Sequence, residues 1–314
     1  MTSKKGYQRE LAPPEKWPEI LRWIHRDLCE TAEFRVQHSL QDLKDAKSHG
    51  VVGTVQSEGE LYAAIYAALL PGQVASIGGL RIDPIVGKDE ATRLIEDVVE
   101  YFSLDRVELF QALADGFDTS EREALAAAGF EFLAFLDHMV LSLNKSTAGS
   151  CEEVIQSLQL PDGLQVTRYQ ESEQQLLESL IVDSYIDTLD CPRLGNGRSG
   201  KAAMDGYLAS RDQPHSWWIA RRDGDAVGCL LLWEKIPEVW ELTYMGIIPS
   251  ARGNKLGELL LEVAIGVSAY LGARQLILSV DRGNSPANRI YENRLFDCYN
   301  STEVWFRQGL GSNR

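Results

Sequence analysis

An internal repeat constrains the fold of this chain more than any other feature. When the first half is laid over the second so that Pro84 falls on Pro249, the apolar positions of two helical segments coincide without a gap. These positions are Ala91 on Leu256, Leu94 on Leu259, Ile95 on Leu260, Val98 on Val263 and Phe102 on Val267. One further residue of offset then places Gly129-Phe130 on Leu295-Phe296. A repeat of this length predicts two copies of one fold, and 314 residues are enough for two hydrophobic cores.

Each copy alternates predicted strands with predicted helices. In the second copy, residues 240–248 form a β-branched and aromatic strand, and Pro249 and Gly253 then break the chain into a loop. A helix with one apolar face follows as far as Gly272, and residues 275–280 form the next strand. We expect an α/β (α+β) protein of two tandem domains, each a mixed β-sheet flanked by helices. The expected boundaries are 1–145 for the first domain, 146–163 for a linker and 164–314 for the second domain.

The loop between strand and helix in the second copy has the features of an anion site. Backbone N–H groups at a helix N-terminus are unpaired and lie at the positive end of the helix dipole, so they attract phosphate. Gly253 and Gly257 allow close backbone approach, and Arg252 and Lys255 add positive charge. The loop contains neither GxxxxGK[ST] nor GxGxxG, so it is not a Walker loop or a dinucleotide fingerprint.

This loop resembles motif A of the GNAT superfamily of acyl-CoA-dependent N-acetyltransferases. That family places Arg/Gln-x-x-Gly-x-Gly/Ala shortly after a strand that ends in an apolar-x-Pro sequence, here Ile247-Ile248-Pro249. The segment 284–291, NSPANRIY, resembles the family's Asn-x-x-Ala-x-x-Leu/Phe-Tyr. The chain departs from the pattern at Lys255, in the middle glycine position, and at Leu295, where Gly-Phe is usual. The tandem arrangement also resembles that of the mycothiol synthase family.

The resemblance implies that the second domain binds acetyl-CoA as a cosubstrate, with no metal. Pantetheine would lie against the strand that ends in motif A, where Gly246 suits a bulge or a close approach, and the phosphates would lie at the following helix. The implied cofactor-binding residues are Met245, Gly246, Ile247, Arg252, Gly253, Asn254, Lys255, Leu256, Gly257, Glu258, Asn284, Ala287 and Asn288. For Asn284, a helix cap is the alternative role.

The same resemblance implies catalytic roles for side chains near this strand. Tyr291 matches the family's tyrosine and would protonate the departing thiolate; the alternative is an aromatic ring packed on the sheet. Glu241 and Glu234 are the candidate bases, either of which could otherwise be a solvated strand residue, and Tyr244 is a lesser candidate. Strict alternation places Glu241 on the same face of the strand as Thr243 and Met245.

Composition narrows the partners. The net charge of −15 argues against nucleic acid and is compatible with a cationic amine, although solubility alone also accounts for it. No apolar run is long enough to span a bilayer and no signal peptide is evident, so a cytoplasmic location is expected. The five cysteines and five histidines are scattered, which predicts reduced thiols and no metal site. The expected partner is a small-molecule or peptide amine, and the sequence does not predict an oligomeric state.

The first copy lacks the residues that the second offers for chemistry. Asp89 and Glu90 stand where the second copy has Asn254 and Lys255, and Leu125 stands opposite Tyr291. The first domain is therefore expected to be a degenerate copy that serves as scaffold. The predicted function of the chain is transfer of an acetyl group from acetyl-CoA to a primary amine. The alternatives are a non-catalytic acyl-CoA-binding or regulatory module, and an interaction protein in which neither copy binds CoA.

Overall fold

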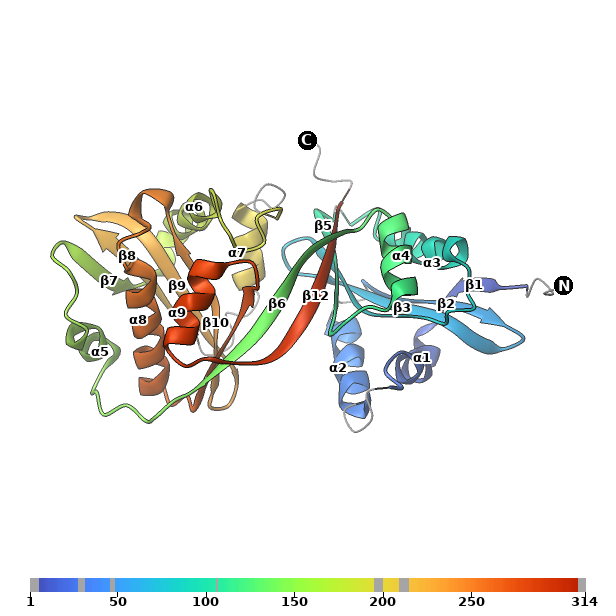
Figure 1. The fold of residues 1–314 in the computed structure, drawn as a ribbon, viewed down its shortest axis with the longest axis horizontal. Coiled ribbons are helices and arrows are strands. Elements are labelled where there is room, and N and C mark those ends of the chain that lie inside the picture. The colour runs from blue at the N-terminus through green and yellow to red at the C-terminus, as the bar shows by residue number, and fades with distance from the viewer. Residues whose placement is uncertain are drawn as a thin grey trace. The chain divides into compact units, whose positions relative to one another are not determined.

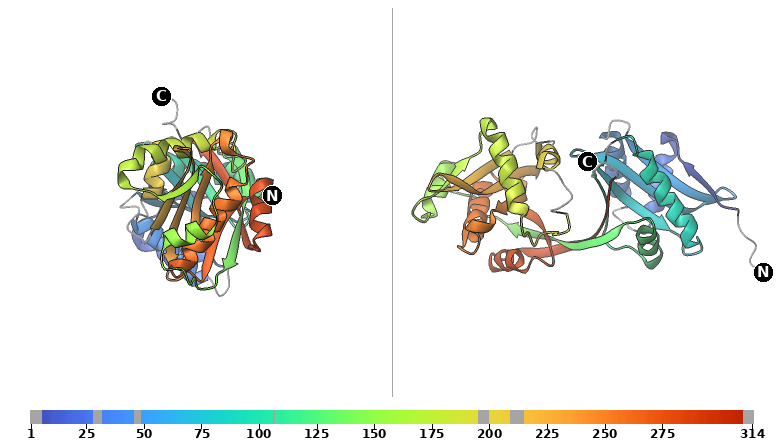
Figure 2. Two further views of the ribbon diagram at one scale, coloured as in Figure 1. Left: turned by 90° about the vertical axis from the view of Figure 1, so that its left-hand side faces the viewer. Right: turned by 90° about the horizontal axis from the view of Figure 1, so that it is seen from above.

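The computed structural model describes residues 6–27, 32–45, 49–105, 107–194, 200–208 and 215–309. The chain forms two compact units. The first consists of Met1–Leu133 and Thr302–Arg314, and the second of Ala134–Ser301. Each unit is a sheet with helices on both faces (Figures 1 and 2).

The sheet of the first unit has the strand order β1-β2-β3-β4-β5-β12. The pairing of β4 with β5 is parallel and the other pairs are antiparallel. The strands are β1 (Gln8–Leu11), β2 (Gly50–Ser57), β3 (Glu60–Leu70), β4 (Val74–Ile82), β5 (Leu109–Ala114) and β12 (Asp297–Gln308). The helices are α1 (Trp17–Ile24), α2 (Ala32–Asp45), α3 (Lys88–Tyr101) and α4 (Thr119–Ala127).

The sheet of the second unit has the strand order β6-β11-β10-β9-β8-β7, and β10 and β11 are parallel. The strands are β6 (Glu131–Ser142), β7 (Leu164–Arg168), β8 (His215–Arg222), β9 (Asp225–Ile236), β10 (Val239–Ile247) and β11 (Gln275–Asp281). The helices are α5 (Cys151–Ser157), α6 (Gln174–Tyr185), α7 (Gly200–Leu208), α8 (Leu256–Tyr270) and α9 (Ser285–Asn293). A short 3-10 turn, η4 (Pro249–Ala251), connects β10 to the loop before α8.

The repeat predicted from the sequence is confirmed by the strand and helix bounds. The offset that aligns the two prolines superimposes the bounds of β2 on β8 and of β4 on β10, and those of β3 on β9 except that β9 is one residue longer at its end. The further offset of one residue superimposes α4 on α9 and β6 on β12. The predicted fold class, two tandem α/β copies of one architecture, is therefore the observed one.

The last strand of each half belongs to the sheet of the other half. Residues Glu303–Gln308 of β12 pair with β5 in the first unit, and Leu136–Ser142 of β6 pair with β11 in the second. Figure 1 shows both strands running from one unit into the other. The boundaries expected from the sequence, 1–145 and 164–314, group each of these strands with its own half. The compact units therefore divide the chain differently from those boundaries. The segment expected as a linker, 146–163, contains α5, which packs on α8 in the core of the second unit.

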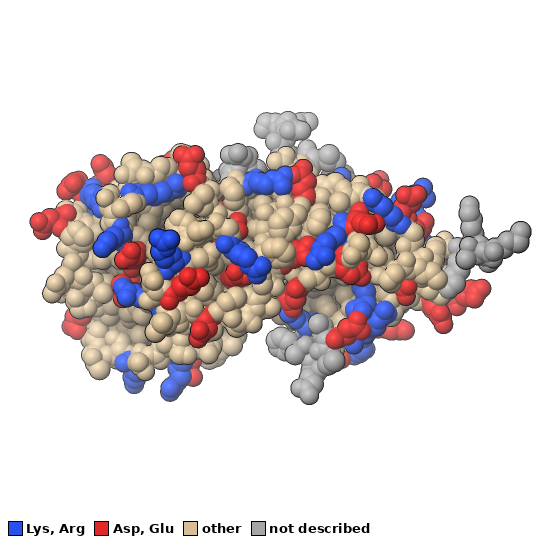
Figure 3. All heavy atoms as spheres, in the orientation of Figure 1, with Lys and Arg blue, Asp and Glu red and all other residues tan. Residues whose placement is uncertain are grey.

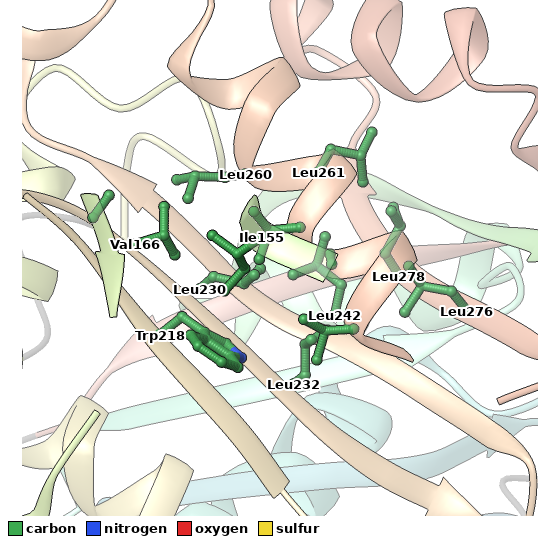
Figure 4. Close-up of a cluster of buried hydrophobic side chains, with 14 of the residues drawn as sticks. Ile155, Val166, Trp218, Leu230, Leu232, Leu242, Leu260, Leu261, Leu276 and Leu278 are labelled. Carbon is green, nitrogen blue, oxygen red and sulfur yellow. The ribbon is translucent and has the colours of Figure 1, made fainter. Parts of the chain in front are cut away.

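Two separate apolar clusters cover the two faces of the second sheet. One is formed by β-strand residues with α5, α8 and Tyr291 of α9, and its centre contains Trp218, Leu230 and Leu260 (Figure 4). The other lies under α6 and α7 and contains Leu177, Met204, Trp217 and Leu231. We refer to these as the α8 face and the α6–α7 face. Because α8 is apolar around most of its circumference, it is the most deeply buried helix of the unit.

Positive and negative side chains are interspersed over the face of the molecule shown in Figure 3. Lys and Arg number 31 against 46 Asp and Glu, so the acidic excess predicted from the sequence is spread over the chain rather than gathered in one run. Among the described helices, none is both long enough and apolar enough to cross a membrane.

Candidate functional site

Strands β10 and β11 part from each other halfway along the second sheet. Val239–Leu242 pair in parallel with Gln275–Leu278, and beyond Leu242 the described part of β10 pairs with β9 alone. The register with β9 shifts by one residue at Thr243, which marks a β-bulge. The edge of Met245–Ile247 that faces β11 therefore has no strand partner within the described chain. An extended ligand can pair with such an edge by backbone hydrogen bonds.

The bulge corrects two expectations about this strand. It lies at Thr243 and not at Gly246. Gly246 instead provides room for neighbouring side chains, since a Cβ there would lie 2.5 Å from Ser184 Oγ and 2.7 Å from Tyr244 Cε1. The extra residue also reverses the alternation of faces. Met245 therefore packs on the α8 face, while Tyr244 packs on the α6–α7 face, the face on which Glu241 lines a pocket. The expectation that Met245 shares a face with Glu241 is wrong.

The loop after β10 presents a helix N-terminus to this gap. Gly253 and Lys255 both have a left-handed backbone, with φ of 80° and 58°, and Lys255 is the N-cap of α8 without a side-chain cap. The first hydrogen bond of the helix joins the N–H of Leu259 to the carbonyl of Lys255. The N–H groups of Leu256, Gly257 and Glu258 thus have no acceptor among the described residues. Unpaired N–H groups at the positive end of a long helix form an anion site.

The side chains of this loop differ in what they contact. A Cβ at Gly253 would meet nothing within 4 Å, so the space above it is open. A Cβ at Gly257 would lie 3.3 Å from Ile290 Cδ1, so this glycine serves the packing of α8 against α9. Asn254, Lys255 and Glu258 are exposed. The described residues provide no partner for the Lys255 ammonium.

Arg252 does not direct its charge toward the helix N-terminus. Its guanidinium donates to four backbone carbonyls: Nε to Ile247 O (3.1 Å), Nη1 to Asp187 O (3.0 Å), and Nη2 to Ser184 O (2.9 Å) and Ile186 O (2.8 Å). These carbonyls lie at the end of β10 and at the end of α6, where helix carbonyls lack intrahelical donors. Arg252 therefore fastens the end of α6 to the end of β10.

On the other side of the gap, α9 places Tyr291 in the α8 core. Tyr291 is 7% exposed, its ring lies 5.7 Å from that of Phe296, and the described residues provide no hydrogen-bond partner for its hydroxyl. Burial, with a smaller effect from Asp190, raises the pKa of this phenol above its usual range. The hydroxyl therefore keeps its proton at neutral pH.

The two asparagines of the α9 segment hold the backbone. Asn284 Oδ1 accepts from Ala287 N–H at 3.4 Å as the N-cap of α9, which is the alternative role considered for this residue. Asn288 Nδ2 donates to the carbonyls of Asp281 and Arg282, both at 3.1 Å. Ala287 packs against the α8 core. These contacts fix the turn between β11 and α9 and so set the position of Tyr291.

A pair of aspartates at the end of β11 was not predicted from the sequence. Asp190 Oδ1 accepts from Asp281 N–H, and Asp281 Oδ2 accepts from Cys191 N–H, each at 3.0 Å. Removal of its carboxylate from water, together with the charge of Asp281, raises the pKa of Asp190. Together with Arg252, these bonds attach both ends of segment 184–191 to the two diverging strands. The partners lie some ninety residues apart in sequence, so no local pattern indicates them. The Gly-rich sequence of residues 191–200 predicts a mobile loop on the substrate side, and residues 195–199 of it lie outside the described residues.

A pocket of about 100 Å³ opens on the α6–α7 face beside the bulge. Its lining comes from α7, β8, β9 and β10 and consists of Gly206, Tyr207, Trp217, Leu231, Trp233, Glu241 and Thr243. Glu241 Oε2 accepts from Trp233 Nε1 at 3.1 Å and from Lys235 Nζ at 3.0 Å. Glu234 is not part of this lining, because its Oε1 accepts from Glu238 N–H across the β9–β10 turn. The structure thus brings Glu241 to the pocket and not Glu234.

Tyr207, Trp217 and Trp233 form an aromatic wall of the pocket, and this wall continues toward Gly246. Tyr244 lies 5.6 Å from Tyr207 and 5.8 Å from Tyr185, measured between ring centroids. Its hydroxyl donates to Ser184 Oγ at 2.6 Å, since the Ser184 hydrogen is directed to Ile181 O. The rings come from α6, α7 and three strands, so no local pattern in the sequence indicates that they lie together.

The first unit repeats the gap between the equivalent strands but differs in the residues around it. Its β4 and β5 pair only as far as Ile77 and Ala112, and the bulge falls at Gly78, the position equivalent to Thr243. There the ring of Tyr66 occupies the space that side chains at Gly78 and Gly79 would need. At the start of α3, Glu90 is held by Arg9 Nη1 at 2.6 Å. The residue equivalent to Tyr291 is Leu125, which is fully buried.

Comparisons with known proteins identify similar sequences and folds. Residues 184–296 match the model of the acetyltransferase (GNAT) family. Over 88 residues the chain is 34% identical to a mycothiol acetyltransferase from Thermomonospora curvata, a match that spans 27% of this chain and 29% of that protein.

Solved structures are similar over nearly the whole chain. A GCN5-related N-acetyltransferase from Sphaerobacter thermophilus gives a TM-score of 0.63 at 18% identity and covers 98% of this chain and 97% of its own. A tandem GNAT protein from the clavulanic acid biosynthesis pathway gives 0.51 at 14% identity, with 96% and 98% covered. At these identities the structures show the shared fold.

Proposed function

Because residues 184–296 match the model of the acetyltransferase (GNAT) family, we propose that the second unit transfers an acetyl group from acetyl-CoA to a primary amine of a small molecule or peptide. The observation that carries this proposal is the gap between β10 and β11, with an unpaired strand edge on one side and the uncapped N-terminus of α8 at its end. An extended thioester arm and a diphosphate need these two features in this order.

In this proposal the pantetheine arm pairs with the free edge of Met245–Ile247. The diphosphate binds the N–H groups of Leu256, Gly257 and Glu258 beneath the open space over Gly253. The Lys255 ammonium supplies the mobile positive charge, because the Arg252 guanidinium is already held by backbone carbonyls. Asn254 contributes through its backbone. Asn284, Ala287 and Asn288 act indirectly by shaping the turn that positions Tyr291.

The reaction needs a neutral amine, a stabilised oxyanion and a protonated leaving thiolate. Glu241 accepts a proton from the ammonium, and the amine lone pair then attacks the thioester carbonyl. The N–H of Met245 or Ile247 stabilises the oxyanion. When the C–N bond has formed and the C–S bond breaks, the Tyr291 hydroxyl protonates the thiolate. The raised pKa of Tyr291 ensures that this proton is present at neutral pH.

The test combines binding and turnover on the full chain. Isothermal titration with CoA should give one site per chain, because the first unit has Glu90 in place of Lys255 and Leu125 in place of the Tyr291 hydroxyl. Release of free CoA thiol from acetyl-CoA should require an added amine. Two equivalent CoA sites would contradict the role assigned to the second unit alone, and absence of any CoA binding would refute the proposal.

A non-catalytic acyl-CoA-binding module is the second candidate. It is favoured by Lys255 and Leu295, which hold left-handed backbones at positions where the family uses glycine. Such a module would bind CoA with one site per chain and release no thiol with any amine in a broad panel. The two measurements above therefore separate the candidates.

A further inference from the structure

The pocket beside Thr243 has walls that are mainly aromatic and come from three different elements. Tyr207 belongs to α7, Trp217 to β8 and Trp233 to β9. Trp217 is 5% exposed, and its ring is supported from behind by Tyr169 at 5.4 Å between centroids. Aromatic walls attract a cation through the negative faces of the rings and exclude water from it.

The charge of the pocket is also suited to a cation. Glu241 is its one charged lining residue, and no Lys or Arg lies in the part of the lining that the structure describes. The Lys235 ammonium, whose side chain is 49% exposed, reaches Glu241 Oε2 from outside the lining. Glu241 Oε1 has no hydrogen-bond partner among the described residues. One carboxylate oxygen is therefore free to accept an N–H from a bound molecule.

Size restricts what the pocket can take. Its volume is about 100 Å³, whereas a cavity that holds a benzene ring measures roughly 150 Å³. A hexosamine or an aromatic amine would have to leave its ring outside. An unbranched alkylammonium group, which is slender and carries three N–H donors, fits both the volume and the free carboxylate oxygen.

We propose that this pocket binds the ammonium end of an unbranched alkylamine, and that such an amine is the acceptor. The second part rests on the proposed function, since it takes the bound amine to be the one acetylated. The first part concerns binding alone. At neutral pH an alkylamine is charged, as its pKa lies near that of lysine, about 10.4. It therefore enters as the cation that the aromatic walls and Glu241 attract.

Binding of n-butylammonium chloride to the full chain, without acetyl-CoA, tests the site directly. It is followed by titration calorimetry and by tryptophan fluorescence, because Trp217 and Trp233 line the pocket. Glu241→Gln should weaken binding about tenfold or more, the size of a lost charge-assisted hydrogen bond. Lys235→Met should strengthen binding several-fold, because it removes the ammonium that competes with a bound cation for the charge of Glu241. Opposite effects of two neighbouring substitutions cannot arise from a general loss of folding.

Trp305→Phe is the matched control. Trp305 Nε1 donates to Glu303 Oε1 at 2.7 Å in the first unit, so this variant removes a similar indole–carboxylate bond away from the pocket. It should leave butylammonium binding unchanged. With the unaltered chain, butylammonium should also bind at least tenfold more tightly than glucosamine or aniline.

The outcomes separate the two proposals. Butylammonium that binds with this mutational pattern but is never acetylated would support the pocket and refute acetyl transfer to it. Acetylation confined to ring amines, with no butylammonium binding, would overturn the pocket assignment while acetyl transfer stood. Binding that is insensitive to both Glu241→Gln and Lys235→Met would likewise overturn the assignment.

Discussion

Leu295 adopts the same left-handed backbone that Gly129 adopts at the equivalent turn of the first unit, with φ of 60° against 79°. Both residues follow a helix in a Schellman arrangement. In α9 the N–H of Phe296 bonds Tyr291 O and that of Leu295 bonds Glu292 O, and in α4 the corresponding bonds start from Phe130 and Gly129. Leu295 is 78% exposed, so its side chain gains little from packing. A left-handed leucine costs about 1 kcal/mol relative to glycine.

Leu295→Gly should therefore stabilise the chain. The expected gain in unfolding free energy is about 0.5–1 kcal/mol, because part of the relieved strain is offset by the greater entropy of glycine in the unfolded chain. The reciprocal Gly129→Leu should destabilise the chain by a similar amount, since a Cβ at Gly129 would meet only the Arg307 side chain, at 3.9 Å. Urea unfolding of both variants measures the difference. A loss of stability in Leu295→Gly would show that the leucine side chain has a packing role.

The turn and the repeat were accessible from the sequence because both depend on local patterns. Apolar spacing in α3 and α8 and the prolines after β4 and β10 align without reference to any distant contact. Gly129 and Leu295 are aligned by the repeat, and both adopt the left-handed backbone although they are different residue types. Local patterns of this kind predicted the order of elements in both units.

Lys255 combines backbone strain with a free positive charge, and two substitutions separate these effects. Lys255→Gly relieves the left-handed φ of 58° and should raise stability by up to about 1 kcal/mol. It should also reduce CoA affinity only slightly, because the N–H groups of α8 remain. Lys255→Glu should weaken CoA binding at least tenfold, because it places a carboxylate beside the proposed diphosphate. Titration calorimetry at two salt concentrations measures the CoA affinity of both variants. Unchanged CoA affinity in Lys255→Glu would place the diphosphate elsewhere.

Arg252 should behave differently, as a structural residue. Arg252→Lys keeps the charge but cannot supply the forked donors that reach Ser184 O and Ile186 O together with Ile247 O. We expect faster amide hydrogen exchange in segment 184–191 and a lower melting temperature. The salt dependence of CoA binding should stay as in the unaltered chain. A reduced salt dependence without faster exchange would instead indicate direct contact with phosphate.

The exchange of last strands predicts which fragments fold. A fragment of residues 146–314 lacks the strand that pairs with β11 and the Asp137 carboxylate that binds Arg282 Nη2 at 2.6 Å. It should fail to unfold cooperatively in urea. A fragment of residues 134–301 contains the whole second unit and should show a cooperative transition. Cooperative unfolding of 146–314 with normal CoA binding would show that the exchanged strand is dispensable.

The exchange, the bulge and the aspartate pair could not be predicted from the sequence for related reasons. The apolar pattern of β6 suits either neighbour, so it does not reveal which sheet the strand joins. Threonine is favoured in strands, so Thr243 carries no sign of a bulge. The bulge nevertheless decides that Tyr244, rather than Met245, lies on the α6–α7 face with Glu241. Asp190 and Asp281 lie some ninety residues apart in the chain, so no local pattern predicts their contact.

Tyr291→Phe tests whether the chain is an enzyme of the proposed mechanism. The substitution keeps the ring against Phe296, so CoA affinity and melting temperature should remain close to those of the unaltered chain. It removes the proton proposed for the thiolate, and turnover should fall about 10²-fold or more. Because burial raises the pKa of Tyr291 above about 10, the unaltered chain should not lose activity through this group as the pH rises from 7 to 9. Tyr270→Phe, which removes an α8 hydroxyl that donates to Gly149 O just before α5, is the control and should retain full turnover. Equal loss of CoA binding and turnover in Tyr291→Phe would assign the hydroxyl to cofactor positioning, and no loss of either would leave water as the proton donor.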